Sequence, residues 1–287
     1  MQPPSYVLTT STPDTTGIVA AITGFLAERG ALITETQHFR DPPGNRSYLR
    51  AVFQDAGTGQ LPGPAGFATA FSPTAARFGM DWQLHEAARR CRMLIAVSRQ
   101  GHCLNSMLNR WHSGTLPVDV AGVVSNHDDQ RRLTEWYGLP YHCLPIGPDG
   151  KLAQEARLLE LFESTGAELL VLARYMQVLS AAACRLLAGR AINIHHSFLP
   201  GFKGARPYHQ AYERGVKLIG ATAHYVTEDL DDGPIIEQEV ERVNHNMDPE
   251  ELTSIGHDLE SVALNRAVRW HAERRIFVHG NRTVVLR

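Results

Sequence analysis

The sequence predicts an α/β protein of two domains: a small ferredoxin-like βαββαβ domain, then a larger Rossmann-like domain built on a mostly parallel sheet. Three observations carry this prediction. The first 86 residues follow the order strand, helix, strand, strand, helix, strand; apolar strands then alternate with helical stretches; and a charged run over residues 85–90 separates the two patterns. We therefore divide the chain into residues 1–86 and 87–287.

The composition is that of a soluble globular protein. A length of 287 residues suits two domains, and 43% hydrophobic and 20% charged residues are ordinary values. The net charge of -2 and the scattered arginine pairs leave no basic stripe, so nucleic acid is not an expected partner. Four widely spaced cysteines argue for a reducing cytoplasm, and neither a secretion signal nor an apolar run of ~18 residues is found, so no membrane partner is expected.

The N-terminal elements follow from local pattern and turn chemistry. An extended segment at 5–11 precedes an apolar helix at 18–28, for which Asp14 or Thr15 is the expected N-cap and Gly30 the stop signal. Two extended segments around a Pro/Gly-rich turn predict a hairpin, followed by a weak helix and a last strand. The ranges are 31–40 and 47–53 for the hairpin, 67–78 for the helix and 80–85 for the strand.

The second domain shows continuous apolar strands of the kind that are buried in parallel sheets. They alternate with helical stretches, which predicts helices on both faces of the sheet. The strands are predicted at 93–97, 118–124, 169–173 and 191–195, the helices at 103–111, 128–137 and 152–164, two further strands at 220–227 and 234–243, and a long helix at 249–273.

Polar residues at the end of the strand at 191–195 are the candidate catalytic groups. Alternation along a strand sends Asn193 and His195 to one face and Ile194 to the other. In an open parallel sheet, ligands bind at the carboxyl ends of the strands. An amide and an imidazole aimed at one oxygen suit a carbonyl that becomes an oxyanion, which predicts acyl or formyl transfer.

The loop at 227–234 holds four acids in five positions, and it is either a cation site or a solvated turn. Its spacing does not match the calcium-binding loop, so no metal is expected there. A carboxylate from this loop would favour protonated His195 and improve it as a donor. His196 is predicted to point to the opposite face of the strand and to be structural.

Two other strand ends are candidate binding segments. The turn at 98–104 has a single glycine and is therefore a poor phosphate cradle; it is predicted to open a helix, with Arg99 or His102 left as candidate substrate contacts. The segment at 172–180 also follows a strand; core packing explains most of its residues, and its exposed backbone is a candidate frame for a flat heterocycle.

Together these residues resemble the formyltetrahydrofolate deformylase family, whose catalytic domain shares the fold of glycinamide ribonucleotide transformylase. The resemblance rests on Asn193, His195 and Asp231, which match the catalytic triad of the family, and covers essentially the whole chain. Further similar motifs are GHCL at 101–104, SNH at 125–127, GARPYHQAY at 204–212 and GNRT at 280–283. The sequence departs from the family pattern at Thr12, where cysteine is usual, and at His257, where arginine is usual.

The resemblance implies a set of binding residues. The folate substrate is expected to contact two segments, the one at 172–180 and the acidic loop at 227–234. The expected contact residues are Met176, Gln177, Val178, Leu179, Thr227, Asp229 and Gly233. The N-terminal domain is similar to ACT domains, which implies methionine and glycine as effectors at Asp14, Gly17 and Ile18, and a homo-oligomer. Neither a cofactor nor a metal is implied.

The activity implied by the resemblance is hydrolysis of 10-formyltetrahydrofolate to tetrahydrofolate and formate, which supplies formate for purine biosynthesis and balances one-carbon folate pools. One alternative is transfer of the formyl group to an amine that lacks a phosphate, since the turn at 98–104 disfavours a phosphorylated acceptor. A second alternative is a non-catalytic amino-acid sensor, and the presence of all three catalytic residues argues against it.

Overall fold

The structure is a computed structural model that describes residues 4–148, 150–199 and 207–287. The chain forms two compact units: unit 1 contains Met1–Arg90, Arg274–His279 and Val284–Arg287, and unit 2 contains Cys91–Glu273 and Gly280–Thr283. The sequence expectation placed the boundary after residue 86 and left the whole C-terminus with the second domain. The structure instead divides the chain after Arg90 and returns most of the last 14 residues to unit 1.

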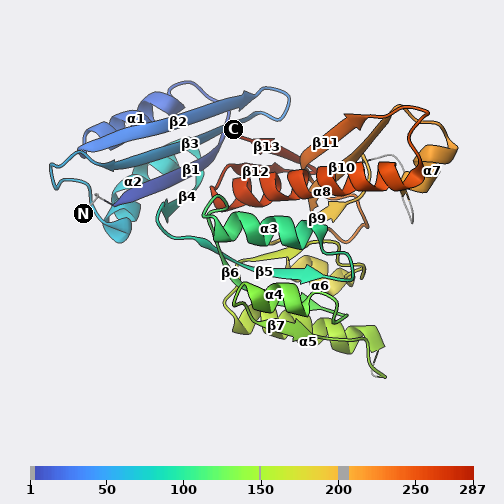
Figure 1. The fold of residues 1–287 in the computed structure, drawn as a ribbon. Helices are drawn as coiled ribbons and strands as arrows, with labels where there is room; N and C mark the ends of the chain where they lie inside the picture. The colour runs from blue at the N-terminus through green and yellow to red at the C-terminus, as the bar shows by residue number, and fades with distance from the viewer. Residues whose placement is uncertain (1–3, 149, 200–206) are drawn as a thin grey trace. The chain divides into compact units, whose positions relative to one another are not determined.

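Unit 1 is a four-stranded antiparallel sheet with two helices (Figure 1). Its strand order, β2-β3-β1-β4, is that of the predicted ferredoxin-like arrangement. The elements are β1 (Ser5–Pro13), α1 (Ile18–Ala27), β2 (Ala31–Asp41), β3 (Arg46–Asp55), α2 (Pro64–Phe78) and β4 (Asp81–Glu86). The predicted N-cap of the first helix is wrong: α1 begins after Gly17, which has φ 87° and makes no side-chain cap.

The core of unit 1 lies between the helices and one face of its sheet. Alternate residues of β3, Leu49, Ala51 and Phe53, face this core and are at most 1% exposed. Phe25 of α1 meets Phe71 of α2 edge to face at 5.0 Å, an arrangement that aromatic rings prefer. Apolar burial of this kind is the main stabilising contribution to a domain of this size.

The other face of this sheet packs with the C-terminal strand β12 (Ile276–His279). The ring of Phe277 lies 5.2 Å from that of Tyr48 on β3. Arg275 donates to Glu35 Oε1 at 3.0 Å and to Gln37 Oε1 at 2.9 Å, both on β2. These long-range contacts are the reason that the C-terminal segment groups with unit 1.

Unit 2 contains a seven-stranded sheet in the order β11-β10-β9-β8-β5-β6-β7. The five strands from β9 to β7 are parallel, and β10 and β11 add an antiparallel edge. The strands are β5 (Cys91–Val97), β6 (Val118–Ser125), β7 (Tyr141–Cys143), β8 (Leu169–Leu172), β9 (Ala191–His195), β10 (Leu218–Tyr225) and β11 (Ile235–Arg242).

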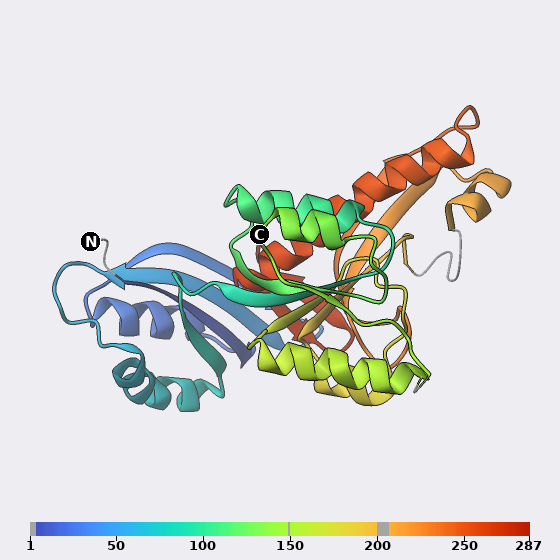
Figure 2. The same cartoon turned by 60° about the horizontal axis from the view of Figure 1, so that its bottom comes forward.

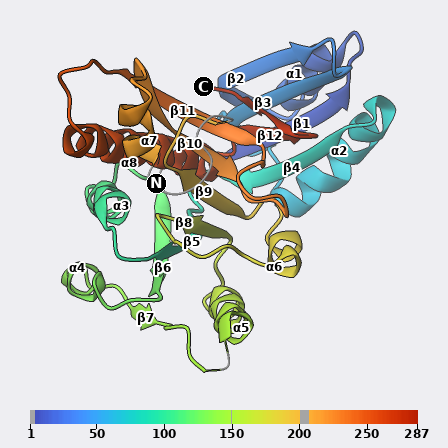
Figure 3. The same ribbon diagram turned by 90° about the vertical axis from the view of Figure 1, so that its right-hand side faces the viewer.

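Helices cover both faces of this sheet. Figures 2 and 3 show α3 and α8 on one face and α5 on the other. The helices are α3 (His102–His112), α4 (Arg131–Trp136), α5 (Gly150–Ser164), α6 (Ala181–Leu186), α7 (Pro207–Glu213) and α8 (Pro249–Ala272), and β13 (Arg282–Val285) pairs with β12. The short elements β7, α6 and α7 were not predicted, since segments of three to seven residues carry little periodicity.

The sheet topology singles out one crevice. From β5 the chain moves first to β6 and β7 on one side and only later to β8 and β9 on the other side. The carboxyl ends of β5 and β8 therefore form a topological switch point, the place where open α/β sheets bind ligands. Among the described residues, no helix is long and apolar enough to span a bilayer.

Candidate active site

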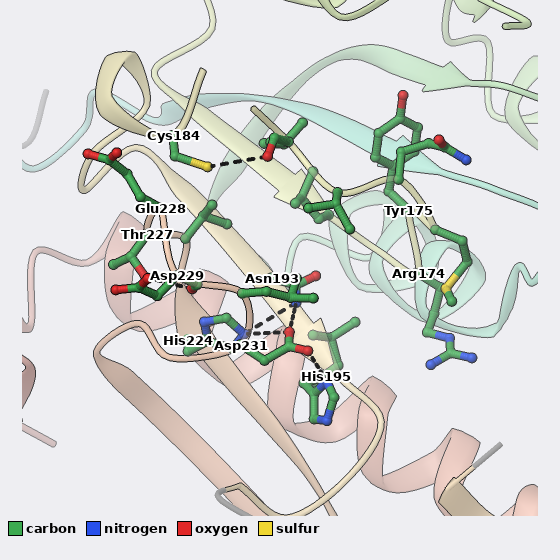
Figure 4. A pocket seen from close by; sticks show the side chains of 18 of the residues that line it. Arg174, Tyr175, Cys184, Asn193, His195, His224, Thr227, Glu228, Asp229 and Asp231 are labelled. Atoms are coloured by element: carbon green, nitrogen blue, oxygen red, sulfur yellow. Dashed lines mark hydrogen bonds and ion pairs between the residues drawn. The ribbon is translucent and has the colours of Figure 1, made fainter. Parts of the chain in front are cut away.

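A cavity of about 270 Å³ lies at the carboxyl ends of β8 and β9 (Figure 4). Asn193 and His195 of β9 and Asp231 of the loop between β10 and β11 line it together. The structure thus brings the three predicted catalytic residues to one place, although 38 positions separate Asn193 from Asp231. The close approach of β9 to β10 places the acidic loop over the end of β9.

His195 and Asp231 form a buried pair. His195 Nδ1 lies 3.1 Å from Asp231 Oδ2, and the His195 ring is 4% exposed. Asp231 has φ 55°, a left-handed conformation that aspartate tolerates better than most residues. The loop closes tightly behind it, because a Cβ on Gly233 would lie 1.8 Å from the carbonyl oxygen of Tyr225. Gly233 therefore shapes the loop and is not among the residues that line the cavity.

The charge of Asp231 is fixed by its two histidine neighbours. Burial raises the pKa of this carboxyl, but hydrogen bonds and charge from His195 and His224 outweigh burial and hold the pKa well below its usual range. Asp231 is therefore ionised at neutral pH. A carboxylate at Nδ1 fixes the orientation of the His195 ring.

His224 was missed by the sequence reasoning, although it lies on β10 directly opposite Asn193. Its Nδ1 lies 2.8 Å from the carbonyl oxygen of Tyr225, so this nitrogen carries a proton in the neutral ring. Nε2 is then an acceptor, and Asn193 Nδ2 donates to it at 3.2 Å. The second Nδ2 hydrogen faces Asp231 Oδ1 across a long 3.5 Å contact.

The segment 176–179 forms the apolar wall of the cavity. Met176 and Val178 are 58% and 51% exposed, which leaves open apolar surface suited to a flat ring. Ser98 holds one end of the segment by accepting from the Met176 N–H at 3.0 Å. Buried Glu155 holds the other end, where it accepts from the Ser180 N–H at 2.6 Å.

The remaining predicted binding residues line two different cavities, one for the expected substrate and one for the expected effectors. Those expected to contact substrate line the cavity of Figure 4, with the exception of Gly233; they are Met176, Gln177, Val178, Leu179, Thr227 and Asp229. The predicted effector residues Asp14, Gly17 and Ile18 line a cavity within unit 1. Of the motif at 204–212, residues 204–206 lie outside the described part of the chain.

The expectation that His196 points away from His195 is wrong. Both rings line the same cavity, and their centroids are 5.1 Å apart. Strand β9 ends at His195, so the alternation of a regular strand does not extend to His196. Burial, followed by the nearby charges of Arg174 and His195, lowers the pKa of His196 to about 4. His196 is therefore neutral at physiological pH.

A second buried group of charges adjoins the cavity around Glu260 of α8. Glu260 is 0% exposed and pairs with His102 Nε2 at 2.7 Å, the Tyr208 hydroxyl at 2.8 Å and Arg174 Nε at 3.4 Å. Burial raises the pKa of Glu260, but the His102 hydrogen bond and the Arg174 charge lower it further than burial raises it. His257 stacks on His102 at 3.9 Å, which gives this departure from the family pattern a packing role.

The same cluster has the spacing of a metal site but not its chemistry. Ligand atoms of His102, Cys103 and Glu260 lie within 4.8 Å of one another. Burial, with Glu260 nearby, raises the pKa of the Cys103 thiol, so the thiol is protonated and a poor ligand. Glu260 is already paired with three donors, one of them the cation Arg174. The arrangement favours an internal ion-pair cluster over a bound cation.

The fold and site define a class of enzyme: an α/β protein that stabilises an oxyanion beside a pocket for a flat ring, as acyl and formyl transfer require. Residues 91–268 match the formyl transferase family model. A formyltetrahydrofolate deformylase from Corynebacterium sp. (strain P-1) is 53% identical over 98% of both chains. This chain therefore belongs to the formyl transferase family and, within it, to the formyltetrahydrofolate deformylases.

Solved structures show the same relationship. A formyltetrahydrofolate deformylase from Burkholderia mallei superimposes with a TM-score of 0.92 at 51% identity, covering 99% of this chain and 100% of its own. A glycinamide ribonucleotide transformylase from Symbiobacterium toebii has a TM-score of 0.63 at 30% identity, covering 69% of this chain and 95% of its own. The family resemblance and the parallel-sheet fold class inferred from sequence are confirmed.

Proposed function

We propose that the protein hydrolyses 10-formyltetrahydrofolate to tetrahydrofolate and formate. The observation that carries the proposal is the convergence of Asn193, His195 and ionised Asp231 in one cavity beside an apolar wall. Water is the expected acceptor, because the turn at the start of α3 is glycine-poor and His102 within it is already bonded to Glu260.

We propose a role for each of the three residues. Asp231 holds the Nδ1–H of His195, so that the protonated ring donates from Nε2 to the formyl oxygen as it gains charge. Asn193 keeps one Nδ2 hydrogen on His224, and the other exchanges its long contact with Asp231 Oδ1 for the same formyl oxygen when the substrate binds. Asp231 also orients the attacking water. The C–N10 bond then breaks, a proton reaches N10, and formate leaves with the oxygen of water.

Loss of any of the three groups should slow the chemical step. Each donor to an oxyanion contributes about 3 kcal/mol, so Asn193→Ala and His195→Ala should each lower kcat by about 100-fold or more. Asp231→Ala should have a comparable effect because it removes the group that orients His195. Near-normal turnover in any of these variants would remove that residue from the mechanism.

Formate release without an acceptor decides between hydrolysis and transfer. The purified protein is incubated with 10-formyltetrahydrofolate alone, and formate and tetrahydrofolate are quantified together. Equal amounts of both products are expected. A strict formyltransferase, including one that uses an amine without a phosphate, would release no formate until the amine was added.

The cavity of unit 1 supports a regulatory site for a small amino acid, as an ACT-like domain would provide. Asp14 and Arg40 pair at 2.5 Å on its lining, next to Gly17 and Ile18 at the start of α1. A carboxylate and a guanidinium at one site suit the amine and carboxyl groups of a zwitterion. Methionine and glycine are the effectors we propose.

Calorimetric titration tests this effector site. Asp14→Asn and Arg40→Gln should each weaken binding of methionine and glycine at least about tenfold, since each removes one charged partner. Arg77→Gln, on α2 and outside the cavity lining, is the matched control. Unchanged titrations for Asp14→Asn would exclude this cavity as the effector site.

The physiological setting follows from the reaction. Hydrolysis returns tetrahydrofolate to the one-carbon pool and yields formate, and we propose that this formate supplies purine biosynthesis. We also propose a homo-oligomer in the cytoplasm; the lack of disulfides among the four cysteines, all in the described residues, supports a reducing compartment. No cofactor or metal is needed for the proposed steps.

A further inference from the structure

Arg174 lies directly beyond β8 in a backbone conformation that is unusual for arginine. Its φ of 64° is in the left-handed region, and such conformations persist where the surroundings hold them. The Arg174 carbonyl accepts from the Ser98 N–H at 3.2 Å, which ties the residue to the end of β5. Arg174 is thus fixed at the switch point of the sheet, where ligands of this fold class bind.

One edge of the Arg174 guanidinium is fully occupied. Nε and Nη2 donate to Gln100 Oε1 at 3.0 and 2.6 Å, and Nε lies 3.4 Å from Glu260 Oε2. Glu260 is shared with His102 and Tyr208, so it does not neutralise Arg174 alone. The side chain therefore keeps a permanent positive charge in a fixed orientation.

The other edge of the guanidinium has no partner among the described residues. Nη1 is buried without a hydrogen bond, although the Arg174 side chain is only 9% exposed. His195 Nε2 is the second buried nitrogen in the cavity lining without a partner in the described chain. A buried polar group left without a partner costs about 1–3 kcal/mol, so two such nitrogens on residues that line one cavity point to a polar ligand.

The charges around the cavity indicate the kind of ligand. The described lining contains the acids Glu228, Asp229 and Asp231, and Arg174 is its only arginine or lysine. Hydrolysis releases formate, an anion, beside ionised Asp231, and this repulsion requires a compensating cation. Figure 4 shows Arg174 at the opposite side of the view from Glu228 and Asp229.

We propose that Arg174 Nη1 and His195 Nε2 form a carboxylate subsite that receives formate, an inference that rests on the proposed hydrolysis. Water adds to the formyl carbon, and the C–N10 bond then breaks with its electron pair and a proton passing to N10. The formyl carbon keeps its hydrogen, its original oxygen and the oxygen of water, and Asp231 passes the remaining proton of the water to solvent. One carboxylate oxygen accepts from Nη1 and the other from protonated Nε2.

Direct binding of ¹³C-labelled formate tests the subsite without turnover. Formate is titrated into the full-length, ligand-free protein and followed by NMR line broadening. Saturable binding is expected for the wild type, and Arg174→Gln should weaken it by at least about tenfold, the loss of one charge-assisted pair. Arg190→Gln is the matched control, because Arg190 is half exposed, pairs with Glu163 at 3.3 Å and does not line the cavity.

Steady-state inhibition gives a second reading that a purely structural role would not change. In Arg174→Gln the inhibition constant of added formate should rise about tenfold, whereas the KM for the folate should stay within about twofold. If Arg174→Gln does not fold, Arg174→Lys is measured in its place. Lysine keeps the positive charge but lacks the paired nitrogens of the guanidinium, so the inhibition constant of formate should rise by less than in Arg174→Gln.

The outcomes separate the subsite from the function. Formate binding that is absent in the wild type, or equal in the wild type and the folded Arg174 variants, overturns the subsite while hydrolysis stands. Failure of the wild type to release formate from 10-formyltetrahydrofolate overturns the hydrolysis and the subsite with it. Loss of formate binding in Arg174→Gln but not in Arg190→Gln supports the subsite.

Discussion

His224 determines which hydrogen of Asn193 is available for chemistry. In the neutral His224 ring the Tyr225 carbonyl favours the proton on Nδ1, and Nε2 then accepts from Asn193 Nδ2. The amide is therefore held with its nitrogen toward the reaction centre. In the proposed mechanism His224 thus positions Asn193.

Replacing His224 should lower kcat without greatly changing KM. His224→Leu removes the acceptor for Asn193, so the amide loses its orientation and kcat should fall about tenfold or more, as for weakened oxyanion donors. His142→Gln, on β7 and outside the cavity lining, should retain wild-type kinetics. A His224→Leu enzyme with normal kcat would contradict this role.

His196 should make the folded protein sensitive to acid. Its pKa is lowered from 6.5 to about 4, so between these values the unfolded chain binds a proton that the folded chain does not. Stability from neutral His196 is thus complete above pH 6.5, declines as the pH falls from 6.5 toward 4, and does not decline further below that. His196→Asn cannot titrate, and its Tm should fall less than that of the wild type between pH 7 and pH 4.5. Parallel Tm profiles would contradict the assignment.

At the scale of elements, helix α8 carries the residue that organises the buried charges, and its close packing depends on a glycine. Glu260 and His257 both project from α8 toward α3 and its neighbours. A Cβ on Gly256 would lie 2.0 Å from the ring of Tyr208, itself a partner of Glu260. The absence of a side chain at this position lets Tyr208 reach Glu260.

Glycine-to-alanine changes in two helices should therefore have opposite signs. Alanine normally stabilises a helix by up to about 1 kcal/mol relative to glycine. Gly24→Ala in α1 meets nothing within 4 Å and should raise the free energy of unfolding. Gly256→Ala should lower it by about 1–3 kcal/mol through overpacking against Tyr208. Denaturant unfolding measures both, and a stabilised Gly256→Ala would contradict the packing argument.

At the scale of the whole molecule, the chain contributes three separate segments to unit 1. It begins there, forms unit 2, and returns after α8 so that β12 packs on the sheet face opposite α1 and α2. This return buries Phe277 against Tyr48 and gives Glu35 a cationic partner in Arg275. The C-terminal segment is thus part of the stability of unit 1.

Truncating Phe277 should loosen unit 1 selectively. Phe277→Ala should destabilise it by about 2 kcal/mol, less than for a fully buried phenylalanine because this ring is only partly buried. Hydrogen exchange should then accelerate in β2 and β3 but not in β5 and β8. Val278→Ala is the matched control, since Val278 is 50% exposed on the same strand. Equal exchange in both variants would contradict a stabilising role for the C-terminal segment.

Much of the fold could be predicted because its signals are local. Apolar runs at β5, β6 and β8 and the helical spacing of α3 and α8 appear within single segments. The short elements β7 and α7 were not predicted, because they contain too few residues to show a periodic pattern. The pairing of Asn193 with His195 followed from alternation within β9. His196 was misplaced because the strand ends one residue before it, which is decided by the contacts around it.

The sequence by itself determined the two-domain α/β class, the candidate catalytic triad and the lack of a glycine-rich phosphate loop, since each is expressed by residues close together in the chain. Only the tertiary structure decided which groups surround that triad. His224 is 31 residues from Asn193, and His102 is 158 residues from Glu260. Contacts at such separations depend on the order of strands in the sheet and the return of the chain, which no local pattern records. The same folding holds Arg174 at the switch point and buries its Nη1 without a hydrogen-bond partner among the described residues.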